Sequence, residues 1–299
     1  MSTEYPLATL IVLFYKHERF VEDTVAGALS QTYPNLEIIF SDDNSPDGTF
    51  ERLKKAVEGY DGPHRIILNR NEKNLGLVAH VNKLLFELSH GEYLFLNGGD
   101  DISLPERVSI GVGYFQSDPS LMAVSGSYLT IDEDGKETGD GIFGQDTLLR
   151  IDDRKYLESD SFMTGGVALS FRRAVLDRFG RLGEECQTED SILRFRSLLL
   201  GPALRSSRLF LKYRVHDGNI SQNIRNFDTR KIASQYMADL NSIKESLSPG
   251  LYKKLEKKIR HYTRIRLLKE KESLSPGLFR PFYQLGRKYL RLVHILSSR

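Results

Sequence analysis

Apolar runs and amphipathic windows alternate along the first third of the chain. An apolar run at residues 9–14 precedes an amphipathic stretch at 21–30, and a second apolar run covers residues 36–40. The alternation continues with a helical window after Thr49, a short strand at 65–68, a helix at 77–88 and a strand at 93–96. Strands that alternate with helices of about ten residues or more predict a parallel sheet covered by helices on both faces.

The second half has a less regular pattern. It contains a strand-like run at 121–131, a Gly- and Asp-rich hairpin at 132–141, an apolar segment at 165–171 and a helical window that ends at Leu199. Beyond about Phe227 only helical patterns remain. We therefore expect an α/β fold with a mixed, mostly parallel sheet flanked by helices, followed by a C-terminal helical extension.

The predicted extension contains one phrase twice. KESLSPGL occurs at residues 244–251 and again at 271–278. Because Ser-Pro-Gly stops one helix and restarts the next, the two copies predict a duplicated helical hairpin.

The charge is divided unevenly along the chain. The whole chain has 42 Lys and Arg against 40 Asp and Glu, which gives no overall signal for nucleic-acid binding. From residue 251 to the end, however, there are 14 Lys and Arg and only three Glu. The basic residues alternate with Leu, Ile, Tyr and Phe at helical spacing. This pattern predicts either a helical extension with a solvated basic face or peripheral contact with an anionic membrane through 251–299.

The cellular location is predicted from the cysteine count and the apolar segments. The single cysteine, Cys186, excludes an intramolecular disulfide and fits a reducing compartment. The apolar run near the start is too short for a signal peptide, and no segment approaches the roughly 20 apolar residues that span a bilayer. We expect a cytoplasmic protein, either soluble or attached to the inner face of the plasma membrane.

Polar residues follow four of the predicted strands. Ligands bind beyond the carboxyl ends of the strands in open parallel sheets, so these residues predict a polar ligand cleft. The four groups are Tyr15-Lys16-His17, Ser41-Asp42-Asp43-Asn44-Ser45, Asn69-Arg70-Asn71 and Asn97-Gly98-Gly99-Asp100-Asp101.

The string IIFSDDNSPDGT joins a predicted buried strand to a helix. A turn followed by a helix start explains Asp47, Gly48 and Thr49. It explains Asp42 and Asp43 less well, because adjacent carboxylates repel each other. A carboxylate at this position can accept the imide N–H of a uracil or thymine ring. Both interpretations stay open on these residues alone.

The string YLFLNGGDDISLPER combines two glycines with two acids after a strand. Gly98 and Gly99 allow the backbone to approach a bulky ligand, and Asp100 and Asp101 can hold a divalent cation. Mg²⁺ and Mn²⁺ prefer carboxylate and phosphate oxygens, which suggests a metal-bridged pyrophosphate. The alternative is an ordinary loop in which Leu104-Pro105-Glu106 leads into the next helix.

Taken together, these motifs resemble the inverting family 2 glycosyltransferases of the GT-A fold. The resemblance covers residues 8–222, about three quarters of the chain, and depends on the order and spacing of several segments. They are Tyr15, SQTYPNLEII, DDNSPDGT, NLG at 74–76, HGEYLFLNGGDDISLPER and TEDSILRFRSLLLG.

The resemblance implies a nucleotide-sugar site. Tyr15 would stack on the nucleobase, Asp43 would form a hydrogen bond to it, and Asp42 would support the loop or the ribose. The implied site also includes Asn74, Gly76, Gly99 and Asp100. Metal ligands for Mg²⁺ or Mn²⁺ would be Asp100, Asp101 and His216. The family usually has its first acid at the position of Gly98 or Gly99, so the metal site of this chain relies on Asp100 and Asp101.

The resemblance also implies a catalytic pair at Glu189 and Asp190, although acids in the first turn of a helix also suit the helix dipole. Asp190 would be the base that deprotonates the incoming hydroxyl, and Glu189 would orient the acceptor or the base. His216 lies in the phrase YRVHDGNIS, in which Asn219 and Ser221 are secondary candidates. Gly165 and Gly166 would shape the acceptor side.

These features predict an inverting glycosyltransferase that uses a UDP-sugar or a dTDP-sugar. Its acceptor would be a lipid-linked saccharide in the synthesis of a cell-surface polysaccharide such as O-antigen or capsule. The glycosyltransferase domain would cover residues 1–222, with a nucleotide-sugar half at about 1–105 and an acceptor half at about 106–222. Residues 223–299 would form the basic extension.

Two alternatives share the same architecture. One is a catalytically silent nucleotide-binding or scaffold protein that lost turnover through Gly98 and Gly99. The other is a nucleotidyltransferase, which needs a basic, glycine-rich phosphate loop after the first strand. Tyr15-Lys16-His17-Glu18 does not supply such a loop.

Overall fold

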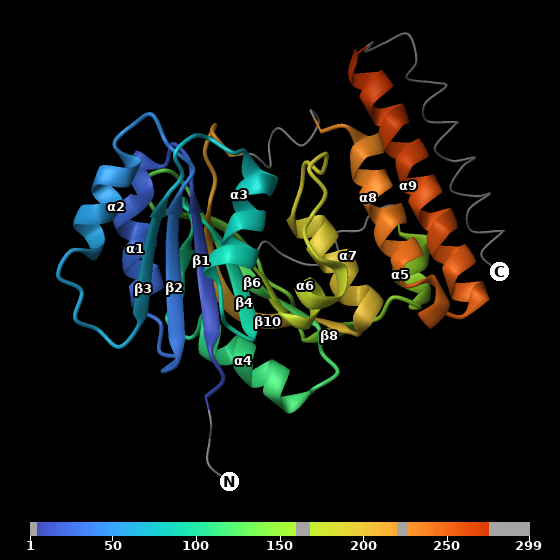
Figure 1. Cartoon of the computed structure of the whole chain (residues 1–299), viewed down its shortest axis with the longest axis horizontal. Coiled ribbons are helices and arrows are strands. Elements are labelled where there is room, and N and C mark those ends of the chain that lie inside the picture. Colours follow the sequence, from blue (N-terminus) through green and yellow to red (C-terminus); the bar gives the residue numbers. More distant parts are fainter. Residues whose placement is uncertain (1–4, 160–167, 220–226, 275–299) are drawn as a thin grey trace.

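A computed structural model describes residues 5–159, 168–219 and 227–274. In this part of the chain, ten strands form one mixed sheet with helices on both faces (Figure 1). The predicted α/β fold class, with a mixed, mostly parallel sheet and C-terminal helices, is confirmed.

The main path of the sheet has the strand order β3-β2-β1-β4-β9-β6-β10-β5, with β7 paired to β6 and β8 paired to β10. Strand β9 is antiparallel to both β4 and β6, so β3, β2, β1, β4, β6 and β10 all run in one direction. Their carboxyl ends therefore meet at one edge. The strands are β1 (Ala8–Phe14), β2 (Leu36–Asp42), β3 (Arg65–Arg70), β4 (Tyr93–Gly98), β5 (Ile102–Ser103), β6 (Ala123–Ile131), β7 (Glu137–Gly141), β8 (Thr147–Leu149), β9 (Ala168–Arg172) and β10 (Ala203–Arg214).

The helices divide between the two faces of the sheet. Side chains alternate along a strand, so Leu10, Val12 and Phe14 face one core while Ile11 faces the other. The core of Leu10, Val12 and Phe14 also contains buried residues of α1, α2 and α4. The core of Ile11 contains buried residues of α3 and of α5 to α9. The described α-helices are α1 (Val21–Leu29), α2 (Thr49–Val57), α3 (Leu77–Lys83), α4 (Arg107–Ser117), α5 (Arg154–Glu158), α6 (Ala174–Phe179), α7 (Asp190–Leu200), α8 (Thr229–Ser242) and α9 (Pro249–Leu274).

Three short helical segments complete the described structure: the 3-10 helices η1 (Glu18–Phe20) and η4 (Lys244–Ser246), and the π-helix η2 (Leu84–Leu88). Segment η2 continues α3, so the helix predicted at 77–88 is present but changes type after Lys83. The predicted strands at 9–14, 36–40, 65–68 and 93–96 are also present.

The C-terminal helices pack against the same core as the sheet. Tyr236 and Leu240 of α8 and Leu255 and Ile259 of α9 belong to the cluster that contains Ile11. The first KESLSPGL phrase lies between α8 and α9, where Pro249 opens the new helix. The second phrase begins inside α9 and continues beyond the described residues. Among the residues that the structure describes, no helix has the length and hydropathy needed to cross a membrane.

Candidate functional site

The polar residues predicted to form a cleft follow parallel strands that end at the same edge of the sheet. Tyr15 and His17 follow β1, Asp42 and Asp43 lie at the end of β2, and Asp100 comes two residues after β4. His216 comes two residues after β10, which runs in the same direction. The topology thus assembles at one edge residues that are about 200 positions apart in the sequence.

Asp100 is the centre of a small cluster of side chains that could bind a metal ion. His216 Nε2 lies 3.0 Å from Asp100 Oδ2, Asn219 Nδ2 donates to the same oxygen at 3.0 Å, and His17 Nε2 lies 4.0 Å from it. Burial acts to raise the pKa of Asp100, but the hydrogen bond from His216 and the charge of His17 outweigh burial and lower it. The carboxylate is therefore ionised at neutral pH.

The donor set of this cluster fits a divalent cation. One ligating atom from each of His17, Asp100 and His216 lies within 4.8 Å of the others. A carboxylate and two imidazoles are common ligands of divalent first-row metals. The side chains of the three residues are also largely shielded from solvent.

Asp101 is not a member of this cluster, although the sequence predicts it as a metal ligand. Its Oδ1 accepts a hydrogen bond from the backbone N–H of Arg214 at 3.0 Å. Burial, and secondly the charge of Asp100, raise the pKa of Asp101 well above its usual value. In the described structure this carboxyl group joins the loop after β4 to the end of β10.

The fully buried side chain of Arg107 stabilises the end of β4 and the loop that follows it. Its Nη1 donates to Asn97 Oδ1 at 2.6 Å, and its Nη2 donates to the Leu96 carbonyl at 2.6 Å. Asn97 in turn donates to the carbonyls of Gly98 and Asp101. These bonds fix the backbone around Asp100.

Asp43 is buried and closes the NLG turn. Its carboxylate accepts from Asn71 Nδ2 at 2.8 Å and from the backbone N–H groups of Leu75 and Gly76, each at 2.9 Å. Gly76 has a φ of +78°, a conformation that favours glycine. Asn74 Oδ1 also accepts from the Gly76 N–H at 3.0 Å. The structure therefore brings together Asp43, Asn74 and Gly76, as the proposed nucleotide site requires.

Asp42 and Tyr15 differ in exposure. Asp42 is fully buried and accepts from both the backbone N–H and the hydroxyl of Ser45, and burial raises its pKa. It builds the turn after β2. Tyr15 is 40% exposed, so its ring is accessible for stacking on a ligand.

The acid pair lies at the start of α7. This helix leads through residues 201–202 into the start of β10, so its first turn lies toward the carboxyl edge of the sheet. Asp190 Oδ1 accepts from Thr188 Oγ1 at 2.8 Å and from the Ser191 N–H at 2.6 Å. Burial, followed by the charge of Asp190, raises the pKa of Glu189 to about 7. One carboxylate is thus held by hydrogen bonds, while its neighbour titrates near neutrality.

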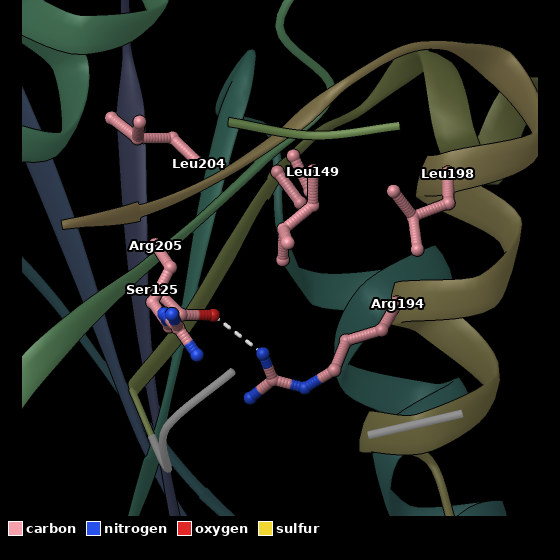
Figure 2. Close-up of a pocket in the computed structure, with 8 residues that line it drawn as sticks. Ser125, Leu149, Arg194, Leu198, Leu204 and Arg205 are labelled. Atoms are coloured by element: carbon pink, nitrogen blue, oxygen red, sulfur yellow. Dashed lines mark hydrogen bonds between the residues drawn. The ribbon is translucent and has the colours of Figure 1, made fainter. Parts of the chain in front are cut away.

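A buried arginine, Arg194, lies on the same helix as Asp190. The positive charge of Arg194, four residues after Asp190, acts against the rise in the Glu189 pKa. Figure 2 shows Arg194 reaching from α7 to Ser125 on β6, with its Nη1 donating to the Ser125 hydroxyl. Leu149, Leu198, Leu204 and Arg205 line the same small pocket. Sequence reasoning missed Arg194, although its spacing from Asp190 places both on one helix face.

Some predicted residues are not described. Gly165, Gly166 and Ser221 lie outside the described ranges. Asn219 is described, and its hydrogen bond to Asp100 joins the His216 loop to the loop after β4. Sequence reasoning did not include His17 among the predicted metal ligands, although it named the residue among those that follow the first strand.

A protein-family model described as "Glycosyl transferase family 2" matches residues 9–180, more than half of the chain. The match includes β1 to β4, the loop with Asp100, and the following elements to the end of α6. It ends before the acid pair of α7 and the His216 loop.

Two relatives show how far the similarity extends. EpsE, a protein of Bacillus subtilis (strain 168) named as a glycosyltransferase, is 33% identical over 130 residues, which are 44% of this chain and 46% of EpsE. The Escherichia coli protein WfaP, named as a UDP-Glc:alpha-D-GlcNAc-diphosphoundecaprenol beta-1,3-glucosyltransferase, is 27% identical over 221 residues, covering 73% of this chain and 80% of WfaP. The first alignment therefore spans less than half of its relative, while the second spans most of it.

Solved structures share the fold at low sequence identity. S. aureus TarS 1–349 in complex with UDP-GlcNAc matches with a TM-score of 0.70 and 15% identity, covering 93% of this chain and 78% of TarS. The mannosyltransferase PcManGT from Pyrobaculum calidifontis, in complex with GDP-Man and Mn2+, matches with a TM-score of 0.58 and 16% identity, covering 99% of this chain and 88% of PcManGT. At such identities the likeness shows the fold alone.

Proposed function

The chain belongs to glycosyl transferase family 2, and we propose that it transfers a sugar from a UDP-sugar, or from a dTDP-sugar, to a hydroxyl of a saccharide acceptor. The observation that carries this proposal is the convergence of Asp43, Asp100 and His216 at the carboxyl ends of β2, β4 and β10. By this proposal, the nucleobase and the diphosphate of the donor would bind at the same edge of one sheet.

The nucleoside end of the donor would bind beside Asp43 and Tyr15. Asp43 supplies an ionisable acceptor held by the NLG turn, and the exposed ring of Tyr15 supplies a stacking surface. Asp42 would act indirectly by holding the turn that carries Asp43. The UDP-GlcNAc in the TarS complex and the UDP-glucose in the name of WfaP support a uridine donor.

The diphosphate would bind at Asp100 and His216, which would hold Mg²⁺ or Mn²⁺. When bound, the cation would neutralise charge on the diphosphate as it leaves. Asp100 is already ionised for this purpose, and Asn219 fixes the orientation of its carboxylate. The Mn2+ in the PcManGT complex supports this assignment. Asp101 stays a candidate ligand through its second carboxylate oxygen, because the Arg214 N–H donates to Oδ1.

The transfer step would invert the anomeric carbon. Asp190 would take the proton from the acceptor hydroxyl, whose oxygen forms the new bond to the anomeric carbon. The bond from that carbon to the diphosphate oxygen breaks on the opposite face, and the nucleoside diphosphate leaves with the electron pair. Glu189 would orient the acceptor or the base, and the positive charge of Arg194 would favour the ionised form of Glu189.

The acceptor would be a lipid-linked saccharide used to build a surface polysaccharide. WfaP, as its name states, acts on a sugar linked to diphosphoundecaprenol. By this proposal, residues 1–222 form the transferase domain and residues 223–299 form a basic extension. The extension would contact the anionic surface from which such an acceptor is presented.

The proposal can be tested by binding and turnover on the full chain. A panel of nucleotide-sugars is screened by thermal shift with and without Mn²⁺, since a ligand at 100 times its Kd adds about 2.7 kcal/mol of stability. Donors that bind are then tested for transfer to a lipid-linked saccharide. We expect UDP-sugars to stabilise the protein and Asp190→Asn to bind donor without turnover. If Asp190→Asn retains near wild-type transfer, the assignment of the base is wrong. If no nucleotide-sugar binds, the proposed function fails.

A further inference from the structure

Position 99 has no room for a side chain. A Cβ atom placed on Gly99 would lie 2.6 Å from His17 Nδ1, 2.5 Å from Phe14 Cδ1 and 2.7 Å from the Leu13 carbonyl oxygen. Such distances are shorter than any ordinary van der Waals contact. The imidazole of His17 therefore occupies part of the space that an acid at position 99 would need.

The ring of His17 is aimed into the cluster around Asp100. Its side chain is 18% exposed, and Nε2 lies 4.0 Å from Asp100 Oδ2. Two atoms that bind one cation with bonds of about 2.1 Å lie roughly 3 to 4.2 Å apart, so this separation suits two ligands of the same ion. His17 and His216 also meet edge to face, with ring centroids 6.4 Å apart.

The other ring nitrogen of His17 has unused hydrogen-bonding capacity. His17 Nδ1 is buried and has no hydrogen-bond partner. Buried polar atoms nearly always have partners. This nitrogen lies against Gly99, which leaves Nε2 as the ring atom that faces Asp100.

The backbone at His17 is fixed by the neighbouring loop. The His17 N–H donates to Thr49 Oγ1 at 3.0 Å, and the Lys16 N–H donates to Ser45 Oγ at 2.9 Å. Lys16 has a φ of +60°, which turns the chain sharply between β1 and η1. On the other side of the cluster, the ring of Phe20 lies 4.9 Å from that of His216. The positions of both imidazoles are therefore set by packing and hydrogen bonds before any ion binds.

We propose that His17 is a third protein ligand of the divalent cation, in place of the acid that is absent at positions 98 and 99, and that this donor set favours Mn²⁺ over Mg²⁺. The inference rests on the metal site of the proposed function and adds a ligand to it. Mg²⁺ demands near-ideal octahedral geometry with oxygen ligands and gives up its waters reluctantly, whereas sites of two imidazoles and one carboxylate bind divalent first-row transition metals, the series that Mn²⁺ begins. Replacing a carboxylate by an imidazole also removes one negative charge, which weakens the attraction for a hard cation.

The first test counts the imidazoles on the bound ion. Mn²⁺ is added to the full-length protein with UDP, and nitrogen couplings are measured by pulsed electron paramagnetic resonance. We expect two imidazole nitrogens in the wild type and one in His17→Ala. A wild-type spectrum with one imidazole or none overturns the inference without the need for any variant.

The second test measures selectivity by calorimetric titration of Mn²⁺ and Mg²⁺ in the presence of UDP. We expect His17→Ala to weaken Mn²⁺ binding at least 10-fold while Mg²⁺ binding changes less than 3-fold. His90→Ala is the matched control, because His90 lies before β4, at the opposite edge of the sheet, and its Nδ1 contacts Glu37. An unchanged Mn²⁺ affinity in His17→Ala, with a wild-type melting temperature, contradicts the proposal.

A compensating variant tests the link to the absent acid. A Cβ on Gly98 would lie 2.5 Å from Asp100 Oδ1, so the Asp100 carboxylate must rotate to make room for it. Adding Gly98→Asp to His17→Ala should restore metal binding with a preference for Mg²⁺. A double variant that folds but binds Mg²⁺ no better than His17→Ala counts against the proposal.

The failure of this inference can be distinguished from the failure of the proposed function. If the protein transfers sugar but its bound Mn²⁺ is coordinated by only one imidazole, the proposed function holds and His17 is not a metal ligand. If Mn²⁺ is coordinated by two imidazoles but no nucleotide-sugar supports transfer, the proposed metal site holds and the proposed function fails.

Discussion

The carboxylate of Asp43 accepts a hydrogen bond from the backbone N–H of Gly76 at 2.9 Å, which joins the end of β2 to the start of α3. The same carboxylate also accepts from Leu75 and Asn71. A carboxylate offers about four acceptor positions, so one remains for a nucleobase N–H. Asp43 can therefore both shape the nucleotide site and contact the ligand.

Asp43→Asn should lose both functions. An amide has only one acceptor atom, so one of the backbone N–H groups would face an NH₂ group. We expect a loss of about 1 to 3 kcal/mol in the free energy of unfolding and at least a 10-fold weaker affinity for UDP. Urea denaturation and calorimetry measure the two effects. Asp140→Asn, at an exposed position on β7, removes the same charge and should change neither. Unchanged values in Asp43→Asn would contradict the assignment.

The acid pair of α7 should produce a pH dependence. Burial and the charge of Asp190 raise the pKa of Glu189 to about 7, so Glu189 is ionised above this pH and protonated below it. If the ionised form orients the acceptor, kcat/KM should rise from pH 5 to pH 7 and level off above.

Two variants separate the roles of the acid pair. Glu189→Gln should lower the rate about 10-fold and shift the rising limb of the profile to lower pH, while Asp190→Asn should abolish transfer at every pH. Steady-state kinetics over the full pH range checks both expectations. A rising limb that stays near pH 7 in Glu189→Gln belongs to another group.

The buried ion pair between α7 and α8 should be important for stability. Arg196 Nε and Nη2 donate to the two carboxylate oxygens of Asp239, each at 2.9 Å, and both side chains are almost completely buried. Removing one partner of such a pair leaves a buried charge. Asp239→Ala should therefore lower the free energy of unfolding by about 3 to 5 kcal/mol.

A surface pair provides the control for this prediction. Arg181 and Glu87 also form an ion pair at 2.9 Å, but each side chain is about half exposed. Glu87→Ala should cost no more than about 1 kcal/mol. Urea denaturation of both variants also tests whether α8 and α9 unfold together with the sheet. If α8 and α9 unfold independently of the sheet, Asp239→Ala will leave the main transition unchanged.

The sequence predicts best those elements whose residues are uniformly apolar or clearly amphipathic. Strands β1, β2 and β4 are apolar runs that become buried in the centre of the sheet. Strand β10 was harder to recognise, because Arg205, Arg208, Lys212 and Arg214 interrupt its pattern. The two-residue strand β5 has no local signal and depends on pairing with β10.

The candidate site was predictable only in part, because some roles depend on contacts between distant segments. The choice between Asp100 and Asp101 depends on Arg214, whose Nε donates to the Asp100 carbonyl and whose N–H donates to Asp101. The proximity of His17 to His216 depends on how the loop after β1 packs against the residues that follow β10. No pattern within the local sequence encodes either contact.

The final prediction concerns the basic surface of α9. Lys253, Lys254, Arg260 and Arg264 are exposed, while Leu255, Ile259 and Ile265 of the same helix are buried. The helix thus packs on the protein through its apolar side and presents cations outward. Near an anionic membrane, each such cation contributes about 1 kcal/mol of attraction.

Two adjacent lysines on each of two helices allow a matched comparison. Reversing both charges in the variant Lys253→Glu, Lys254→Glu should remove at least about 2 kcal/mol of attraction, which corresponds to about 30-fold weaker binding to vesicles that contain anionic lipid. The control variant Lys54→Glu, Lys55→Glu changes another exposed pair of lysines, on α2, at the opposite side of the molecule in Figure 1. Co-sedimentation at low salt measures both. The attraction should disappear in high salt, because exposed charges are screened. Equal losses in the two variants would mean that overall charge, and not the surface of α9, governs membrane contact.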